Sequence, residues 1–356
     1  MRIAVIMSGG RGTRFWPLSR TSRPKQLAPL IDGRSLLELT VERVQPLFKP
    51  DAVWVVTQQS QLEATQAIVG LDRVKALCEP VGKNTAPCIA YVACRARAEF
   101  GDATLAVFPA DHVIRDVEGF HGVVRAGFDF VEKSGRILTI GIEPDRPATG
   151  FGYIKRGEII GSAGGFDFFN VSKFTEKPDL EAARKYVDDG SYLWNAGIFV
   201  FRASDMLSEM EKHLPGIASS FCEYGTAVGT DAEDGKKSEA YSSARDISID
   251  FGIMEKTDRA CVVPADLGWD DLGNWDSFSK YLSTDDSGNA VEGDLVALDT
   301  ANCTVYSSGQ TVAALGVENL IVIATDDAIL ITAKDRGEEV KKLVDLLAAR
   351  GLKHLL

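Results

Sequence analysis

A glycine-rich loop directly after a short apolar strand constrains this chain more than any other feature. Residues 3–7 (Ile-Ala-Val-Ile-Met) are typical of a buried strand, and the stretch 7–26 that follows contains Gly9, Gly10 and Gly12. Because glycine lacks a Cβ atom, backbone N–H groups in such a loop can close around a phosphate. All cationic side chains of this region precede the first acidic residue of the chain, Asp32: Arg2, Arg11, Arg14, Arg20, Arg23 and Lys25. The loop is therefore predicted to bind an anion.

The spacing of the glycines excludes two common phosphate-binding motifs. A dinucleotide-binding fingerprint requires a glycine three residues after Gly12, where Phe15 stands, and a P-loop requires Gly-Lys-Ser/Thr, which is absent. A basic, solvated loop remains the structural alternative at this point. What is left is a third pattern, Gly-Gly-x-Gly-x-Arg followed by Pro17 and then by Pro24-Lys25.

Composition narrows the class of protein. With 356 residues, 45% hydrophobic and 25% charged, the chain has room for one large globular domain and a small one. A net charge of −12 argues against nucleic acid or an anionic membrane as a partner. Neither a membrane-spanning run nor a leader is recognisable, so we expect a cytoplasmic protein. Six cysteines without a Cys-x-x-Cys pair and four scattered histidines predict reduced thiols and no zinc site.

Strands and helices alternate over the first part of the chain. Ser35 and Glu38 form a capping box before an amphipathic helix, and residues 52–57 and 74–78 are predicted strands separated by a helix that begins near Gln61. This alternation predicts an α/β fold, a doubly wound and mostly parallel sheet with helices on both faces. In such a sheet the ligand binds at the carboxyl ends of the strands.

Two segments place polar side chains at such strand ends. Residues 79–90 open a helix rich in small residues, with Pro87 suited to its first turn, and a well-capped helix start is the simpler explanation. Asp111 follows an apolar strand at residues 104–108. A carboxylate buried there must be hydrogen-bonded, paired with a cation or bound to a metal, and helix capping is the alternative.

The character of the sequence changes near residue 286. Short aliphatic runs begin at Leu295, Thr304, Val312, Leu320 and Ile329, with spacings of 9, 8, 8 and 9 residues. They predict a small all-β unit, either a short solenoid or a small sandwich, and residues 338–350 predict a closing amphipathic helix. We therefore expect a first domain over residues 1–280 and a second over residues 286–356.

Taken in order, the motifs resemble those of the sugar-1-phosphate nucleotidyltransferase family, and within it those of mannose-1-phosphate guanylyltransferases. The resemblance covers nearly the whole chain. It rests on Gly9-Gly10-x-Gly12-x-Arg14, Pro24-Lys25, Glu79-Pro80 to Thr85-Ala86-Pro87, Pro109-Ala110-Asp111-His112, Glu176-Lys177-Pro178, Trp194 to Phe199, Ser248 to Lys256 and Trp269-Asp270-Asp271-Leu272-Gly273.

The resemblance implies a fold, a reaction and a site. The fold would be that of the nucleotide-diphospho-sugar transferases, with a left-handed β-helix-like tail often used in dimer contacts, so a homodimer is expected. The reaction would convert GTP and α-D-mannose 1-phosphate into GDP-mannose and diphosphate with Mg²⁺. The implied residues are Gly9, Gly10, Gly12, Arg14 and Lys25 for the triphosphate; Glu79, Asn84, Thr85 and Pro87 for guanine; Gly150, Glu176, Lys177 and Asn195 for the sugar phosphate; and Asp111 with Asp271 for the metal. Arg14, Lys25, Asp111 and Asp271 would be catalytic, and Asp270 is the alternative metal ligand.

Two rival functions remain open from sequence. The same chemistry could serve another sugar 1-phosphate or another nucleotide, or the chain could be a non-catalytic regulatory subunit that binds sugar nucleotides. Such a subunit is expected to have lost Asp111, Asp271 or Lys25, and all three are present. Longer members of the family carry a metal-dependent phosphomannose isomerase domain. Because only His354 lies beyond His213, we expect a monofunctional transferase.

Overall fold

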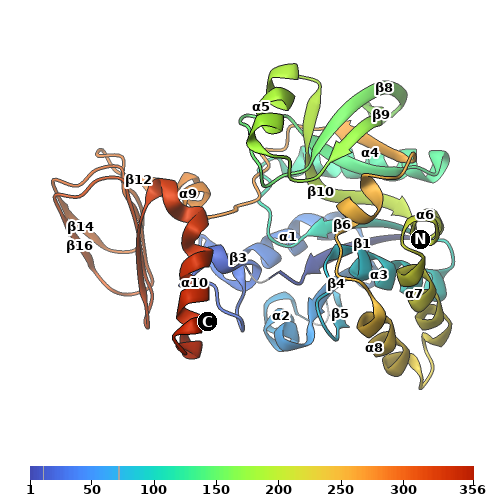
Figure 1. Cartoon of the computed structure of the whole chain (residues 1–356), viewed down its shortest axis with the longest axis horizontal. Helices are drawn as coiled ribbons and strands as arrows, with labels where there is room; N and C mark the ends of the chain where they lie inside the picture. Colours follow the sequence, from blue (N-terminus) through green and yellow to red (C-terminus); the bar gives the residue numbers. More distant parts are fainter. Residues whose placement is uncertain (11, 71–72) are drawn as a thin grey trace.

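The computed structural model describes residues 1–10, 12–70 and 73–356. Its largest sheet is mixed and has nine strands (Figure 1). Arg11, one of the cations of the glycine loop, lies outside these ranges. The strand order is β5-β4-β1-β6-β10-β7-β11-β9-β8. The strands are β1 (Arg2–Ser8), β4 (Val53–Gln58), β5 (Lys75–Glu79), β6 (Thr104–Pro109), β7 (Ile137–Ile142), β8 (Tyr153–Ala163), β9 (Phe166–Thr175), β10 (Tyr192–Arg202) and β11 (Ala260–Pro264).

The pairing confirms the predicted α/β sheet, although only four of the eight neighbouring strand pairs are parallel, so the sheet is mixed where a mostly parallel one was expected. Strand β1 runs parallel to β4 and β6, β4 runs parallel to β5, and β7 runs parallel to β11. Strand β10 lies antiparallel between β6 and β7, and β8 and β9 add an antiparallel hairpin at the edge. The carboxyl ends of β1, β5 and β6 therefore meet at one edge of the sheet, where the ligand was expected.

Helices cover both faces of this sheet. They are α1 (Leu36–Val44), α2 (Leu62–Val69), α3 (Thr85–Phe100), α4 (Val117–Ser134), α5 (Leu180–Asp189), α6 (Ala203–His213), α7 (Pro215–Ala227) and α8 (Glu233–Ser243). The predicted cap of α1 is present, because the Ser35 hydroxyl accepts the N–H of Glu38 at 3.1 Å. None of the helices in the described ranges is long and apolar enough to span a membrane.

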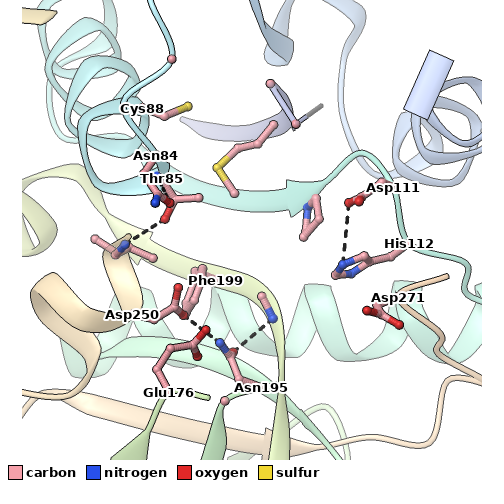
Figure 2. Close-up of a pocket in the computed structure, with 18 of the residues that line it drawn as sticks. Asn84, Thr85, Cys88, Asp111, His112, Glu176, Asn195, Phe199, Asp250 and Asp271 are labelled. Atoms are coloured by element: carbon pink, nitrogen blue, oxygen red, sulfur yellow. Dashed lines mark hydrogen bonds and ion pairs between the residues drawn. The ribbon is translucent and has the colours of Figure 1, made fainter. Parts of the chain in front are cut away.

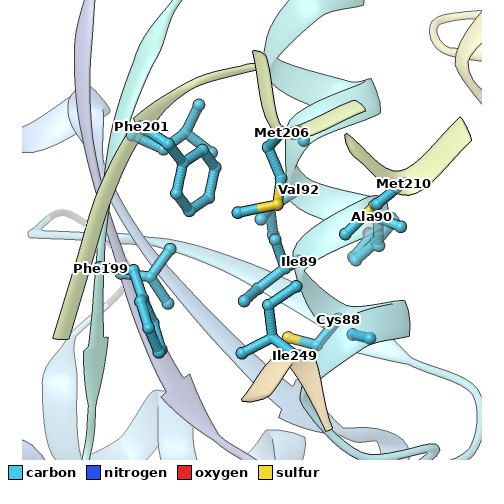
Figure 3. Close-up of a cluster of buried hydrophobic side chains, with 14 of the residues drawn as sticks. Cys88, Ile89, Ala90, Val92, Phe199, Phe201, Met206, Met210 and Ile249 are labelled. Carbon is cyan, nitrogen blue, oxygen red and sulfur yellow. The ribbon is translucent and has the colours of Figure 1, made fainter. Parts of the chain in front are cut away.

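Side-chain alternation along β1 gives the molecule one core on each face of the sheet. Ile3 and Val5 face a core built with α3, α6 and α7, whereas Ala4 and Ile6 face a core built with α1 and α4. Figure 3 shows the first core, where residues of α3 pack between β10 and α6: Cys88, Ile89, Ala90, Val92, Phe199, Phe201, Met206 and Met210. This packing fixes the N-terminus of α3 beside the carboxyl ends of the strands.

The C-terminal region is a β-helix-like unit, as the family resemblance implied, and of the two alternatives predicted from the strand spacing it is the solenoid that is present. Residues 283–333, all of them described, form a five-stranded sheet of order β12-β13-β15-β17-β18 and a two-stranded sheet β14-β16. The pairs β13–β15, β15–β17 and β14–β16 are parallel, so successive strands alternate between two sheets as in a solenoid. The bounds are β12 (Ser283–Thr284), β13 (Ala290–Glu292), β14 (Leu295–Leu298), β15 (Thr304–Ser307), β16 (Val312–Leu315), β17 (Leu320–Ala324) and β18 (Ile329–Ala333).

A third core joins this unit to the glycine loop. Helices α9 (Trp275–Phe278) and α10 (Val340–Ala349) lie between the β-helix-like unit and the large sheet (Figure 1). Phe15, Trp16 and Leu18 of the loop are buried against residues of the C-terminal region, among them Val340. The Trp16 indole N–H donates to the carbonyl of Leu355 at 2.8 Å. The C-terminal region therefore supports the segment that was predicted to bind phosphate.

Candidate active site

A cavity of about 670 Å³ opens at the carboxyl ends of β1, β5 and β6 and extends to the residues that flank the hairpin β8–β9, Gly150 to Gly152 and Glu176. Figure 2 shows its side chains pointing inward from three directions, with Asn84 and Thr85 on one side, Glu176 and Asn195 on a second, and Asp111 on a third. Ten of the residues predicted from sequence line it: Gly9, Gly10, Glu79, Asn84, Thr85, Asp111, Gly150, Glu176, Asn195 and Asp271. One cavity thus unites segments spread over most of the chain.

The glycine loop is held by side-chain amides. Gln26 donates to the carbonyls of Ser8 and Gly10, each at 3.1 Å, and Gln58 donates to the carbonyl of Gly9 at 2.6 Å. These bonds engage the carbonyl oxygens of Ser8, Gly9 and Gly10, so this part of the backbone is held in place without a ligand.

Gly12 does not line the cavity but fixes Lys25. Its φ of 58° lies in the left-handed region, and a Cβ atom there would stand 2.2 Å from the Cβ atom of Lys25. Only glycine fits this close approach.

Lys25 joins the two acidic segments. Its buried ammonium lies 3.1 Å from Asp111 Oδ2 and donates to the backbone carbonyl of Asp271 at 2.7 Å. Burial is the largest single influence on the pKa of Asp111 and raises it, but the charge of Lys25, its hydrogen bond and the other neighbouring contacts together hold that pKa below its ordinary value. Lys25 therefore keeps Asp111 ionised and close to the Asp271 loop.

A short backbone bridge explains how Asp111 and Asp271 converge. Val113 and Asp270 form an antiparallel bridge, with N···O distances of 2.9 and 3.0 Å. The two carboxylates thus come from loops that run side by side although they are far apart in sequence. Burial raises the pKa of Asp271. A cation bound beside this carboxylate would favour its ionised form and oppose that shift.

Asp270 is engaged elsewhere. Its Oδ1 accepts the N–H of Leu272 at 2.7 Å, and its Oδ2 lies 3.7 Å from the ammonium of Lys280. Within the described part of the chain, no cluster of three or more His, Cys, Asp or Glu side chains could hold a metal by itself. Two carboxylates nevertheless suit Mg²⁺, which binds proteins through one or two carboxylates and completes its shell with water and substrate phosphates.

Asn84 and Thr85 begin α3 and also line the cavity. Asn84, with φ of 67°, is the N-cap, and its side-chain oxygen accepts the N–H of Thr85 at 3.0 Å. The Thr85 hydroxyl accepts the N–H of Ile249 at 2.8 Å. The simpler explanation from sequence, a well-capped helix start, is thus also correct. Pro87 is buried in the first turn of α3 and does not line the cavity.

The opposite end of the cavity carries a network centred on Asn195. Its amide donates to Asp250 Oδ1 at 2.8 Å (Figure 2). Its oxygen accepts from the Thr139 hydroxyl at 2.8 Å. Glu176 is buried beside it, and the ammonium of the more exposed Lys177 lies 2.6 Å from Glu176 Oε1. These donors and acceptors suit a ligand rich in hydroxyl groups.

Arg14 lies outside the cavity in this structure. Its guanidinium is about half exposed and stands 4.0 Å from Glu338, which precedes α10. The predicted role of Arg14 in binding the triphosphate therefore stays a prediction.

Comparison with known proteins identifies the family. Residues 3–287 match the family profile described as nucleotidyl transferase, and residues 293–347 match the MannoseP isomerase/GMP-like β-helix domain. The chain belongs to the nucleotidyl transferase family. This nucleotidyl transferase is 40% identical to the xanthan biosynthesis protein XanB of Xanthomonas campestris pv. campestris, over 98% of its own length and 74% of that protein.

Other relatives agree. The mannose-1-phosphate guanylyltransferase of Escherichia coli K12 is 38% identical over 98% of this nucleotidyl transferase and 73% of the relative. A crystal structure of a protein from Thermus thermophilus, described as a mannose-1-phosphate geranyltransferase, superimposes with a TM-score of 0.86 at 35% identity. The superposition covers 98% of this chain and 99% of the other.

Two residues of the nucleotidyl transferase site were missed by sequence reasoning. His112 lines the cavity, and because its Nδ1 accepts the indole N–H of Trp269 at 3.1 Å, its proton resides on Nε2, 3.8 Å from Asp111 Oδ1. Burial lowers the pKa of His112 to about 4, so the ring is neutral. Asp250 also lines the cavity. Both stand inside the quoted motifs, which were the available signal.

Proposed function

We propose that the chain joins GTP and α-D-mannose 1-phosphate into GDP-mannose and diphosphate. The observation that carries the proposal is the cavity that brings together the Glu79 carboxylate, a hydrogen-bonding network at Asn195, and two carboxylates at Asp111 and Asp271. The relatives named mannose-1-phosphate guanylyltransferase, at 35–38% identity over nearly the whole chain, support the same reaction.

The chemistry is an in-line displacement at phosphorus. A phosphate oxygen of the sugar phosphate attacks the α-phosphorus of GTP, a P–O bond forms, and the bond to the β-phosphate oxygen breaks to release diphosphate. The nucleophile is already anionic, so neither a base nor a covalent intermediate is required. Two unit charges 4 Å apart repel by about 1 kcal/mol in water and about 4 kcal/mol at an effective dielectric of 20. The main task of the protein is to offset this repulsion.

Cationic side chains and backbone N–H groups carry out that task. Lys25 and Arg14, with the N–H groups of the loop Gly9 to Gly12, bind the triphosphate and stabilise the charge that develops on diphosphate. Lys177 binds the phosphate of the sugar. The hydroxyl groups of the sugar form hydrogen bonds with Glu176, with Asn195 and with the backbone at Gly150. Glu79, Asn84 and Thr85 surround guanine, and Pro87 supports them from the first turn of α3 without lining the cavity.

Asp111 and Asp271 are the proposed ligands of one Mg²⁺. When bound, the ion withdraws charge from the α-phosphate and aligns the two substrates. Lys25 contributes to this arrangement directly, because it holds Asp111 and the Asp271 backbone together.

The tail is proposed to mediate a homodimer. We assign catalysis to residues 1–280 and assembly to residues 286–356. Apolar side chains of the sheet β14-β16 are 60–69% exposed, a pattern that favours burial against a second copy: Val296, Leu298 and Leu315. All six cysteines lie in the described ranges and are free thiols, which suits the reducing cytoplasm.

A substrate matrix tests the proposal. Purified protein is incubated with each nucleoside triphosphate and each of several sugar 1-phosphates, and diphosphate release is measured. The expected result is highest kcat/KM for GTP with mannose 1-phosphate, loss of activity with a chelator and recovery with Mg²⁺. Preference for another pair would favour the same chemistry on other substrates. Binding of GDP-mannose without any turnover would favour a regulatory subunit.

A further inference from the structure

A buried hydrogen bond behind the cavity connects α8 to Glu79. The Tyr241 hydroxyl donates to Glu79 Oε1 at 3.0 Å, across 162 positions of the sequence. Glu79, the last residue of β5, lines the cavity, whereas Tyr241 is completely buried and does not. The hydrogen bond to Glu79 therefore gives the Tyr241 hydroxyl a direct link to a residue that lines the cavity.

Aromatic packing fixes the position of the Tyr241 hydroxyl. The ring makes edge-to-face contacts with Tyr91 of α3 at 5.8 Å and with Phe221 of α7 at 5.1 Å between centroids. Because side chains from two helices pack against the ring, the position of its hydroxyl group is fixed. The hydrogen bond to Glu79 is thus imposed by the fold and does not depend on a flexible side chain.

With Oε1 engaged, the carboxylate of Glu79 has a defined orientation. Its Oε2 lies towards the glycine loop, because a Cβ atom added at Gly9 would stand 3.3 Å from it. An ionised carboxylate is an acceptor only and can take up two adjacent donors. The guanine edge offers such a pair, N1–H and the 2-amino group, whereas hypoxanthine offers N1–H alone.

The surroundings of Glu79 make the hydroxyl important. Burial raises the pKa of Glu79 to about 7, and the hydrogen bond from Tyr241 opposes this shift. The other titratable groups that sense its charge are Cys88 on α3 and Cys78 on β5. Tyr241 therefore favours the ionised carboxylate, which accepts from a base.

We propose that Tyr241 is a positioning residue for base selection: its hydroxyl orients the Glu79 carboxylate so that both oxygens serve N1–H and the 2-amino group of guanine. This role rests on the proposed use of GTP. It assigns to α8, which lies outside the cavity, a part in nucleotide specificity.

Tyr241→Phe removes only the hydroxyl. Steady-state kinetics with GTP and with ITP, which lacks the 2-amino group, measure its effect. We expect KM for GTP to rise about tenfold, as for loss of a hydrogen bond to a charged group. The preference for GTP over ITP should fall, while kcat and KM for mannose 1-phosphate stay unchanged. The rise in KM should shrink at higher pH, where Glu79 ionises without help.

Tyr224→Phe is the matched control. Tyr224 is equally buried, its ring lies 5.2 Å from that of Tyr91, and its hydroxyl accepts from Arg95 at 3.2 Å, away from the cavity. This variant should keep the wild-type GTP/ITP preference and pH profile. A matching fall in that preference in both variants would mean that loosened packing, and not the hydroxyl of Tyr241, sets base choice.

A double-mutant cycle with Glu79→Gln completes the test. In that background Tyr241→Phe should no longer alter the GTP/ITP preference, because the carboxylate is gone. Additive effects, or equal increases of KM for GTP and ITP in the single variant, would overturn the role of Tyr241 and leave the proposed function intact. A wild-type protein that prefers another nucleoside triphosphate over GTP would overturn both.

Discussion

Asp270 and Asp271 are adjacent, yet their side chains are engaged differently. Asp270 accepts the N–H of Leu272 and lies near the ammonium of Lys280, whereas Asp271 lines the same cavity as Asp111. Lys25 pairs with the carboxylate of Asp111 and donates to the backbone carbonyl of Asp271, so these three residues form one connected unit.

Removing one charge from this unit should impair chemistry and not folding. We expect Asp111→Asn and Asp271→Asn each to lower kcat/KM by about two to three orders of magnitude, because each change removes one of the two proposed metal carboxylates while the shape is kept. Circular dichroism should show an unchanged fold. Asp270→Asn is the control and should keep most of the activity. Near-normal turnover of Asp111→Asn would exclude the assignment.

Lys177 provides a second test at this scale. Its ammonium is exposed and paired only with Glu176 among the described contacts, so it can turn to an incoming sugar phosphate. Lys177→Ala should raise KM for mannose 1-phosphate about tenfold and leave KM for GTP nearly unchanged, as expected for loss of a charged hydrogen bond. Equal increases of the two constants would instead point to a structural ion pair.

At the scale of elements, the glycine loop depends on a contact that sequence does not reveal. Gly12→Ala would force a Cβ atom against Lys25, so the loop or the lysine must shift. We expect kcat/KM to fall by at least about tenfold, because a small displacement of a catalytic group is sufficient for such a loss. Gly33→Ala is the control, since Gly33 also has a positive φ of 70° but nothing within 4 Å of an added Cβ. Similar kinetic losses in both variants would contradict this explanation.

Elements specified by local patterns were predictable, and those specified by distant partners were not. The parallel strands β1, β4, β5 and β6 follow from apolar runs between helices, and the cap of α1 follows from Ser35. The antiparallel insertion of β10 between β6 and β7 depends on pairings that no local pattern encodes.

The same reason explains which site residues were missed. Asp111 could be recognised because a carboxylate at the end of an apolar strand requires a partner. His112 and Asp250 gain their roles from Trp269 and Asn195, which are 157 and 55 positions away. Tyr241 belongs to an ordinary-looking helix, and only the fold brings its hydroxyl to Glu79.

Across the whole molecule, the C-terminal region and the glycine loop share one core. Phe15 and Trp16 pack with Trp275, Tyr306 and Val340, and the Trp275 indole donates to the carbonyl of Trp16 at 3.0 Å. Buried residues of the glycine loop thus pack against residues beyond 270. Loss of packing in the tail should therefore be felt in catalysis.

Val340 of α10 tests this coupling, because it is 3% exposed in the shared core whereas Leu343 on the same helix is 37% exposed. Val340→Ala should lower the free energy of unfolding by about 2 kcal/mol, because buried methyl groups are removed and the void that they leave in the shared core is only partly refilled. Leu343→Ala should change it by less than about 0.5 kcal/mol.

If the tail only mediates assembly, Val340→Ala will leave KM for GTP at the wild-type value under conditions where the protein stays folded. If the shared core orders the glycine loop, KM for GTP will rise in Val340→Ala and not in Leu343→Ala, with KM for mannose 1-phosphate unaffected. We expect the second result, since Val340 packs in the same cluster as Phe15 and Trp16, while the sugar network at Asn195 lies on the far side of the cavity.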